Sequence, residues 1–246
     1  MHQPCGRAIC INGVLTMWVI SSIRRVAQRL TLFIIVAAAF SYLSWAAADP
    51  FAFSNPALER IERIYGTAAR GRVVRWRELV GRLKDESEQS KLDAVNAFFN
   101  EMNFVSDVAH WGREDYWATP VEFLGTNGGD CEDFSVAKYF TLRELGVPDE
   151  RMSLTYVKSL TLDQAHMVVT YFPQPSADPL VLDNIDGRIR RASTRTDLLP
   201  VYSFNGANLW LAKERGRGKL VGGSDRLGRW RRLNERMRSQ VLNSAN

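Results

Sequence analysis

The hydrophobic pattern of this chain changes from a helical period to a strand period near residue 150, and this change constrains the fold most. Amphipathic helical patterns come first, at 56–65, 73–84, 90–102 and 131–146. Alternating or β-branched runs follow, at 152–159, 166–172, 180–184 and 201–205. Apolar residues at every third or fourth position indicate helices with one buried face, whereas the later runs are typical of short strands. Helices followed by antiparallel strands predict an α+β fold.

The first 48 residues have the order of a secretory signal. Three arginines between residues 24 and 29 precede an apolar run over 30–45, and three alanines at 46–48 follow it. A positive end, an apolar core and a small-residue cleavage site are the parts of a signal peptide. The run is short for a membrane span, which needs about 20 residues. We therefore expect export, with residues 1–48 as a signal peptide or a retained N-terminal anchor.

Charge is unevenly distributed over the rest of the chain. The whole chain has 32 basic and 27 acidic residues, and residues 1–48 contain four of the basic residues and no acid. Residues 213–246 carry ten basic and three acidic residues, which leaves a net of −6 on residues 49–212. The sequence pI of about 9.3 therefore gives no reason to expect nucleic-acid binding. We expect a domain over 49–212 and a basic tail over 213–246, solvated or in weak contact with anionic lipid or an acidic partner.

Cys131 is the only cysteine after the leader, and it lies in the acidic run TNGGDCEDFS. The helical pattern begins at this residue, so the thiol is expected in a first helical turn. The positive end of a helix favours a thiolate. The neighbouring Asp130, Glu132 and Asp133 disfavour it, because negative charge raises the pKa of a thiol. Either the thiol is a small core residue beside ordinary capping acids, or something neutralises the acids.

Two later residues have the right types and spacing to activate this thiol. His166 begins a strand-like run 35 positions after Cys131, and Asp183 ends the next run 17 positions further on. If these two runs pair as a hairpin, the imidazole and the carboxylate meet at its open end. A nucleophile, a base and an orienting acceptor form a catalytic triad. His110 is the alternative base.

Three segments carry a resemblance to a known family: GGDCEDFSVAKYFTLRELG, AHMVV and VLDN. Together they resemble the bacterial transglutaminase-like cysteine proteases, and among them the LapG type, over roughly residues 58–210. The resemblance implies a papain-like core, with N-terminal helices and a nucleophile helix packed on an antiparallel sheet. It implies that Cys131 is the nucleophile, His166 the base and Asp183 the orienting residue.

The same resemblance implies a biological role. Members of this type are periplasmic, calcium-dependent endopeptidases that cleave the N-terminal region of a large, repeat-rich surface adhesin at a paired-alanine site, and so control biofilm attachment. An inner-membrane receptor for cyclic di-GMP sequesters them. We therefore expect this chain to be periplasmic, with the adhesin as its substrate and the receptor as its partner.

Calcium would explain the acids beside the thiol. In the family the acids that flank the cysteine are tied to calcium, which assigns Asp130, Glu132 and Asp133 as ligands here. Ca²⁺ takes about six to eight oxygen ligands, largely from carboxylates. One short run does not supply a complete shell, so Asn127, Asp115 or water is expected to contribute. A bound dication would cancel the field of the acids and favour the thiolate.

Other functions remain open on the same residues. A transglutaminase-type acyl transferase would use the same triad with an amine in place of water, because both reactions share the acyl-enzyme. A calcium-gated binding module with an idle thiol would need only the acidic residues. Gln164 and Asn184 are candidates for assisting the oxyanion or the histidine.

Overall fold

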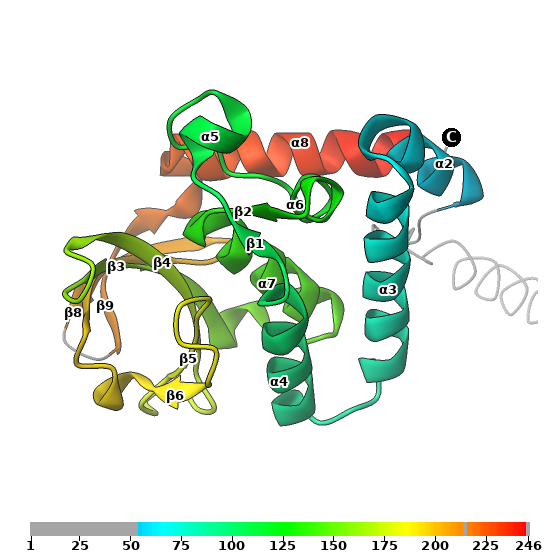
Figure 1. Cartoon of the computed structure of the whole chain (residues 1–246). Helices are drawn as coiled ribbons and strands as arrows, with labels where there is room; N and C mark the ends of the chain where they lie inside the picture. The colour runs from blue at the N-terminus through cyan, green and yellow to red at the C-terminus, as the bar shows by residue number, and fades with distance from the viewer. Residues whose placement is uncertain (1–53, 214–215, 245–246) are drawn as a thin grey trace, which may run out of the picture. The chain divides into compact units, whose positions relative to one another are not determined.

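The computed structural model describes residues 54–213 and 216–244. The proposed leader over 1–48 lies outside the described residues. Within the described part of the chain, no helix combines the length and the apolar character that crossing a membrane requires. The helices are α2 (Asn55–Tyr65), α3 (Thr67–Leu83), α4 (Glu88–Phe99), α5 (Asp107–Trp111), α6 (Pro120–Thr126), α7 (Cys131–Glu144) and α8 (Gly228–Ser244), shown in Figure 1. The helical patterns of the sequence are thereby confirmed.

A seven-stranded antiparallel sheet follows helices α2 to α7 in sequence, as predicted, and α8 follows the sheet. Its strands are β3 (Met152–Ser159), β4 (Gln164–Tyr171), β5 (Leu180–Leu182), β6 (Arg190–Arg191), β7 (Leu198–Phe204), β8 (Asn208–Lys213) and β9 (Gly216–Gly223). They lie in the order β6-β5-β4-β3-β7-β8-β9. Strands β4 and β5 form the expected hairpin, with Val169 paired to Leu182 and Tyr171 to Leu180. Asp183 therefore follows directly on the last paired residue of β5.

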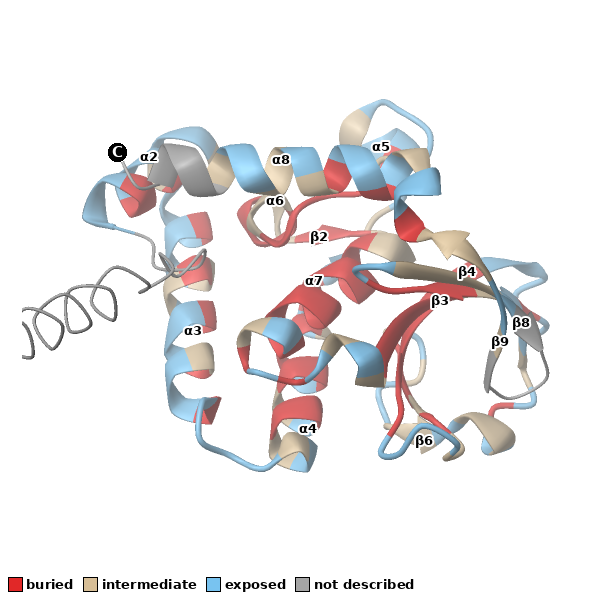
Figure 2. Ribbon diagram, turned by 180° about the vertical axis from the view of Figure 1, so that it is seen from behind, coloured by how far each residue is buried: buried red, intermediate tan, exposed pale blue. Residues whose placement is uncertain are grey.

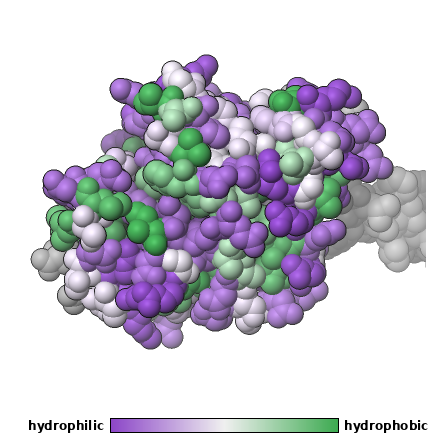
Figure 3. Space-filling view, viewed as in Figure 1, coloured by the Kyte–Doolittle hydropathy of each residue, from purple (hydrophilic) through white to green (hydrophobic). Residues whose placement is uncertain are grey.

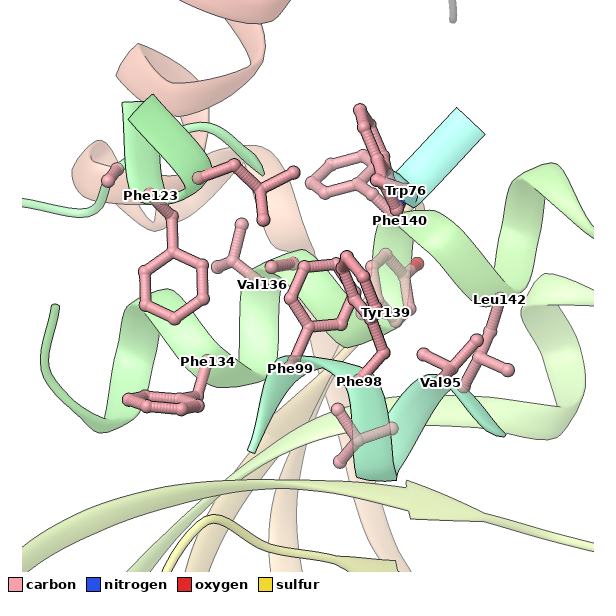
Figure 4. Close-up of a cluster of buried hydrophobic side chains, with 14 of the residues drawn as sticks. Trp76, Val95, Phe98, Phe99, Phe123, Phe134, Val136, Tyr139, Phe140 and Leu142 are labelled. Atoms are coloured by element: carbon pink, nitrogen blue, oxygen red, sulfur yellow. The ribbon is translucent and has the colours of Figure 1, made fainter. Parts of the chain in front are cut away.

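Helix α7 lies at the centre of the core and packs against β3 and β4 (Figure 1). Its residues from Asp133 to Leu142 are all buried, as is typical of a helix covered on every side. Figure 4 shows the aromatic side chains of α4, α6 and α7 packed together around Phe99, Phe123 and Phe134. Burying each large apolar side chain contributes about 1.5–3 kcal/mol. The first turn of α7 is thus held in place by the largest block of apolar contacts in the described fold.

Two glycines let the chain enter α7 through a close backbone contact. Strand β2 (Gly128–Gly129) pairs in parallel with β1 (Asn103–Phe104). A Cβ at Gly128 would lie 2.3 Å from the carbonyl oxygen of Asn103, and one at Gly129 would lie 2.1 Å from Asp133 Oδ2. Such distances exclude any side chain. The glycines therefore bring the start of α7 against the rest of the core.

The basic segment 213–246 differs from the solvated tail expected from its composition. Strand β9 completes the sheet, and α8 inserts Trp230 and Leu233, exposed by 2% and 0%, into the main core. Trp230 stacks on Phe140 of α7, with ring centroids 5.4 Å apart. Figure 2 shows exposed and buried positions alternating along α8. Arg231, Arg232 and Arg238 are exposed, whereas Arg236 contacts Glu122 and the backbone carbonyl of Trp117. These arginines hide, in the composition, the narrow apolar stripe that fixes the helix.

The outer strands of the sheet keep apolar side chains at the surface. Those exposed by about half lie on the β3–β4 turn and on β7 to β9: Leu160, Leu162, Leu199, Val201, Leu211 and Leu220. Figure 3 shows apolar side chains gathered over this end of the sheet, among polar neighbours. The described helices thus cover the central strands, where the site lies, and leave these outer positions to solvent.

Candidate active site

Cys131 opens α7, the position that the sequence predicted, and a capping box fixes it there. Asp130 is the N-cap, and its Oδ1 accepts a hydrogen bond from the backbone N–H of Glu132 at 3.2 Å. Asp133 accepts in return from the backbone N–H of Asp130 at 3.3 Å. This reciprocal pair satisfies the backbone N–H groups of Asp130 and Glu132 at the start of the helix. The acids beside the cysteine thus have a structural role whatever else they bind.

The thiol of Cys131 lies in a strongly acidic environment. It is partly buried, and its Sγ–H donates to Glu132 Oε2 at 2.9 Å. Burial raises the pKa of the Cys131 thiol, and the charges of Glu132 and Asp130 raise it further, while a backbone hydrogen bond with Met167 lowers it. The raising effects dominate. With only these groups around it, the sulfur is a protonated, weak nucleophile.

The predicted base, His166, lies on β4, a strand against which this helix packs. His166 is 2% exposed, and its Nε2 lies 2.8 Å from Asp183 Oδ1. Ser135 of α7 donates to the backbone carbonyl of Met167, the next residue of β4, at 2.9 Å. The start of α7 and the start of β4 are therefore in direct contact. Because Asp183 contacts Nε2, Nδ1 is the imidazole nitrogen that could take a proton from another group.

Asp183 is held on both of its carboxylate oxygens. Oδ1 accepts from His166 and from the backbone N–H of Ile185 at 3.0 Å, and Oδ2 accepts from Arg195 Nη2 at 2.8 Å. Burial alone would raise the pKa of Asp183, but the hydrogen bonds from His166, Ile185 and Arg195 outweigh it and hold the pKa below its usual range. The residue is therefore a carboxylate at neutral pH and able to stabilise an imidazolium.

A fourth acid, Asp107 of α5, joins the acids beside the cysteine. Carboxylate oxygens of Asp107, Asp130 and Asp133 lie within 4.8 Å of one another, and so do ligand atoms of Asp130, Cys131 and Glu132. Burial is the first cause that raises the pKa values of Asp107, Asp130 and Asp133, and mutual repulsion adds to it. These four acids, Asp107, Asp130, Glu132 and Asp133, are called the acidic cluster below.

The donor set of the acidic cluster fits a hard divalent cation. Asp107 Oδ2 accepts from the backbone N–H of Tyr116, whereas Asp107 Oδ1 is buried and has no hydrogen-bond partner among the described residues. A buried carboxylate oxygen without a partner is costly unless an ion or a donor meets it. Several carboxylates around such an oxygen are the ligands that Ca²⁺ prefers.

The residues proposed to complete the shell have other contacts. Asp115 forms an ion pair with Arg229 of α8 and accepts from the indole of Trp117 at 3.1 Å. Asn127 ends α6 in the left-handed conformation, with φ 63°, which asparagine tolerates well. Asp107, which the sequence analysis did not single out, is the acid that lies within 4.8 Å of Asp130 and Asp133. Its only sequence signal was a Ser-Asp pair at the start of a short helix, within a stretch without clear periodicity.

The remaining candidates are His110, Gln164 and Asn184. His110 of α5 packs edge-on against Trp111, with ring centroids 4.7 Å apart, and burial lowers its pKa. Gln164 is exposed at the start of β4. Asn184 follows Asp183 directly, and its Oδ1 is buried without a hydrogen-bond partner in the described structure. His166 is thus the histidine that contacts an orienting acid.

Comparisons with known proteins agree with this geometry. A family model described as bacterial transglutaminase-like cysteine proteinase, BTLCP, matches residues 75–215. The structure of EGTA-treated LapG from Legionella pneumophila is 45% identical, with a TM-score of 0.65, over 73% of this chain and 97% of that chain. Calcium-bound LapG from the same organism is 45% identical, with a TM-score of 0.63, over 73% and 98%. None of the curated proteins matches the chain.

Proposed function

The chain belongs to the bacterial transglutaminase-like cysteine proteinases, and from this premise we propose that it is a calcium-dependent endopeptidase that cleaves the N-terminal region of a large surface adhesin. The observation that carries the proposal is the buried contact between His166 and Asp183, beside a helix that starts with Cys131. A base with an orienting carboxylate next to a cysteine at a helix N-terminus is the arrangement that acyl transfer requires.

The residues of the chain divide the reaction between them. His166 takes the thiol proton, and the sulfur of Cys131 attacks the carbonyl carbon of the scissile peptide bond. The backbone N–H of Cys131, at the start of α7, is a donor for the resulting oxyanion. The imidazolium then protonates the leaving amine, and Asp183 stabilises its charge in the meantime. A water molecule, activated by the same imidazole, then attacks the thioester carbon; the C–S bond breaks, and the carboxylic acid product and the free Cys131 thiol are released.

The acidic cluster is the proposed calcium site, with Asp107, Asp130, Glu132 and Asp133 as the residues that would hold the ion. When bound, a dication there supplies the positive charge that lowers the pKa of the adjacent thiol. Support comes from the partnerless oxygen of Asp107 and from the relative that has been solved in calcium-bound and EGTA-treated forms.

The cellular setting is proposed on the N-terminal pattern and the family resemblance. Export through residues 1–48 would place the enzyme in the periplasm, where it would meet the N-terminal region of a surface adhesin. Cleavage at a paired-alanine site would release the adhesin and end biofilm attachment. An inner-membrane receptor for cyclic di-GMP would sequester the enzyme and so protect the adhesin.

A cleavage assay tests this proposal. The protein is incubated with an N-terminal adhesin fragment that contains a paired-alanine site, with Ca²⁺ or with EGTA, and the products are identified by mass spectrometry. We expect one cut in Ca²⁺ and none with EGTA or with Cys131→Ala. Cleavage that persists in both of those samples would disprove it. A primary amine added in a parallel sample distinguishes acyl transfer, which would incorporate the amine, from hydrolysis.

A further inference from the structure

Arg195 contacts the side of Asp183 that faces away from His166. Its side chain is 4% exposed, and its Nη2 lies 2.8 Å from Asp183 Oδ2. We propose that Arg195 is a positioning residue for catalysis: it fixes the Asp183 carboxylate so that Oδ1 stays on His166 Nε2. This inference deepens the proposed function, because it rests on His166 and Asp183 acting as base and orienting acid.

Arg195 is itself held rigidly. Asp197 receives two of its hydrogen bonds, from Nε to Oδ1 at 2.9 Å and from Nη2 to Oδ2 at 2.7 Å. Such a paired contact fixes both the distance and the plane of the guanidinium. Nη2 bridges two carboxylates, so the orientation imposed by Asp197 passes directly to Asp183. An arginine with this anchoring loses little side-chain freedom in holding its second partner.

The contact also determines which nitrogen of the imidazole carries the proton. With Oδ2 bound to Arg195 and Oδ1 facing Nε2, an ionised Asp183 accepts the Nε2–H bond, and the Nδ1 lone pair remains for the thiol. The other charged groups near this pair are Lys138 of α7, which is buried and interacts with Asp183, and Asp197. Arg195 is the cation that hydrogen-bonds to the carboxylate.

A purely structural role is the competing explanation, because the same contacts close the loop between β5 and β7. Asn100 Nδ2 donates to the backbone carbonyl of Asp183 at 2.9 Å, and Asn96 Nδ2 donates to that of Gly187 at 2.9 Å. Helix α4 therefore holds this loop independently of Arg195. A structural role predicts lower stability with an unchanged imidazole, whereas a positioning role predicts a changed imidazole in a folded protein.

Imidazole NMR distinguishes the two roles without any substrate. Protein labelled with ¹⁵N at histidine is compared for wild type, Arg195→Met and the control Arg188→Met, whose side chain is 75% exposed. His2→Gln and His110→Gln assign the signals by elimination. We expect a slowly exchanging Nε2–H of His166 in wild type and in Arg188→Met, and its loss or a shift to the other tautomer in Arg195→Met. An unchanged signal in folded Arg195→Met would overturn the proposal.

Kinetics on the cleavable fragment provide the second readout. We expect Arg195→Met to lower kcat on the order of tenfold to a hundredfold with little change in KM, and Arg195→Lys to recover part of the loss. If Arg195→Met does not fold, Asp197→Asn replaces it. This variant weakens the contact that holds the guanidinium and keeps the contact between Arg195 and Asp183. A wild-type kcat together with wild-type NMR signals in Asp197→Asn would also overturn the proposal. The NMR measurement needs no substrate. An error in the proposed substrate would therefore leave its result unchanged, whereas an error in the proposed role of Arg195 would change it.

Discussion

The two halves of the active site both contain buried carboxylates, but only one half supplies the cation that balances them. On the base side, Arg195 bridges Asp183 and Asp197. On the nucleophile side, carboxylate oxygens of Asp107, Asp130 and Asp133 lie within 4.8 Å of one another, and within the described ranges no member of the acidic cluster forms an ion pair with lysine or arginine. The pKa values differ accordingly: that of Asp183 is lowered, whereas those of Asp130 and Asp133 are raised.

Folding alone therefore completes the half of the site around His166, but not the half around Cys131. The base side is finished by the chain's own hydrogen bonds, so the imidazole is oriented once the domain has folded. The nucleophile side holds a thiol whose pKa is raised by the same acids that would bind an ion. We therefore expect a cation bound at the acidic cluster to act on the sulfur and to leave the base unaffected.

The largest expected effect is on the base side. Asp183→Asn should lower kcat by about 10⁴-fold, because Arg195 must donate to the new carbonyl oxygen, and the amide NH₂ then faces His166 Nε2. That nitrogen must accept, so its proton moves to Nδ1, the wrong tautomer for taking the thiol proton. Calcium affinity, measured by calorimetry, should equal that of wild type. A large loss of calcium affinity would show that the two halves are not independent.

Chelation should have the next largest effect, and on the nucleophile side only. Each unit by which the thiol pKa rises lowers the thiolate fraction about tenfold, so EGTA should slow alkylation of Cys131 by iodoacetamide on the order of 10³-fold. Site-specific mass spectrometry separates this cysteine from Cys5 and Cys10. The His166 Nε2–H signal should persist in EGTA. Equal alkylation rates with and without calcium would refute a calcium-controlled thiol.

Removing one carboxylate of the cluster should have a smaller effect. Asp107→Asn should weaken calcium binding about tenfold to a hundredfold, because it removes the charge of the residue with the partnerless oxygen. Asp115→Asn is the matched control: Asp115 is a nearby acid, but its partners are Arg229 and Trp117. Calorimetric titration should give a wild-type affinity for this control. The reverse ranking of the two variants would place the ion nearer Asp115.

The sequence predicts the local parts of this site well. Gly128-Gly129 and the acids around Cys131 specify the start of α7, because capping depends on residues within one helical turn. The contact between His166 and Asp183 follows from a hairpin between two strands that are consecutive in sequence. In both cases the determining residues are close in sequence or joined by one predictable pairing, and the structure agrees with the pattern.

Sequence reasoning missed the residues whose contacts are far away in sequence and the apolar residues that stand among many arginines. Asp107 joins the cluster through the fold of an irregular loop, where no periodicity indicates its direction. Arg195 appears in the sequence as one of many arginines, and its burial depends on Asp183 and Asp197 meeting it in the folded loop. The two apolar residues Trp230 and Leu233 stand among arginines, so average composition hid the buried face of α8.

The smallest expected effect is on stability, and it has opposite pH dependence on the two sides. The raised pKa values of Asp130 and Asp133 mean that the metal-free fold holds more protons than the unfolded chain above about pH 4, so stability falls as the pH rises. Asp183 has a lowered pKa, and its contribution is complete above the unfolded pKa of about 4 and is lost only as the pH falls towards the folded pKa. Between pH 5 and pH 8 the acidic cluster should therefore dominate the change in the free energy of unfolding.

Calcium should cancel that loss, because it binds the deprotonated cluster and its affinity rises with pH. At a free concentration 100 times Kd it should add about 2.7 kcal/mol, or about 5 to 10 °C in Tm for a domain of this size. Thermal unfolding at pH 5 and pH 8, with calcium or EGTA, should show the larger gain at pH 8. Asp130→Asn should flatten this difference, whereas Asp183→Asn should leave it intact, since its charge is balanced within the chain. A gain that is equal at both pH values would mean that the cluster is already ionised without calcium, and the contrast between the two halves would then be absent.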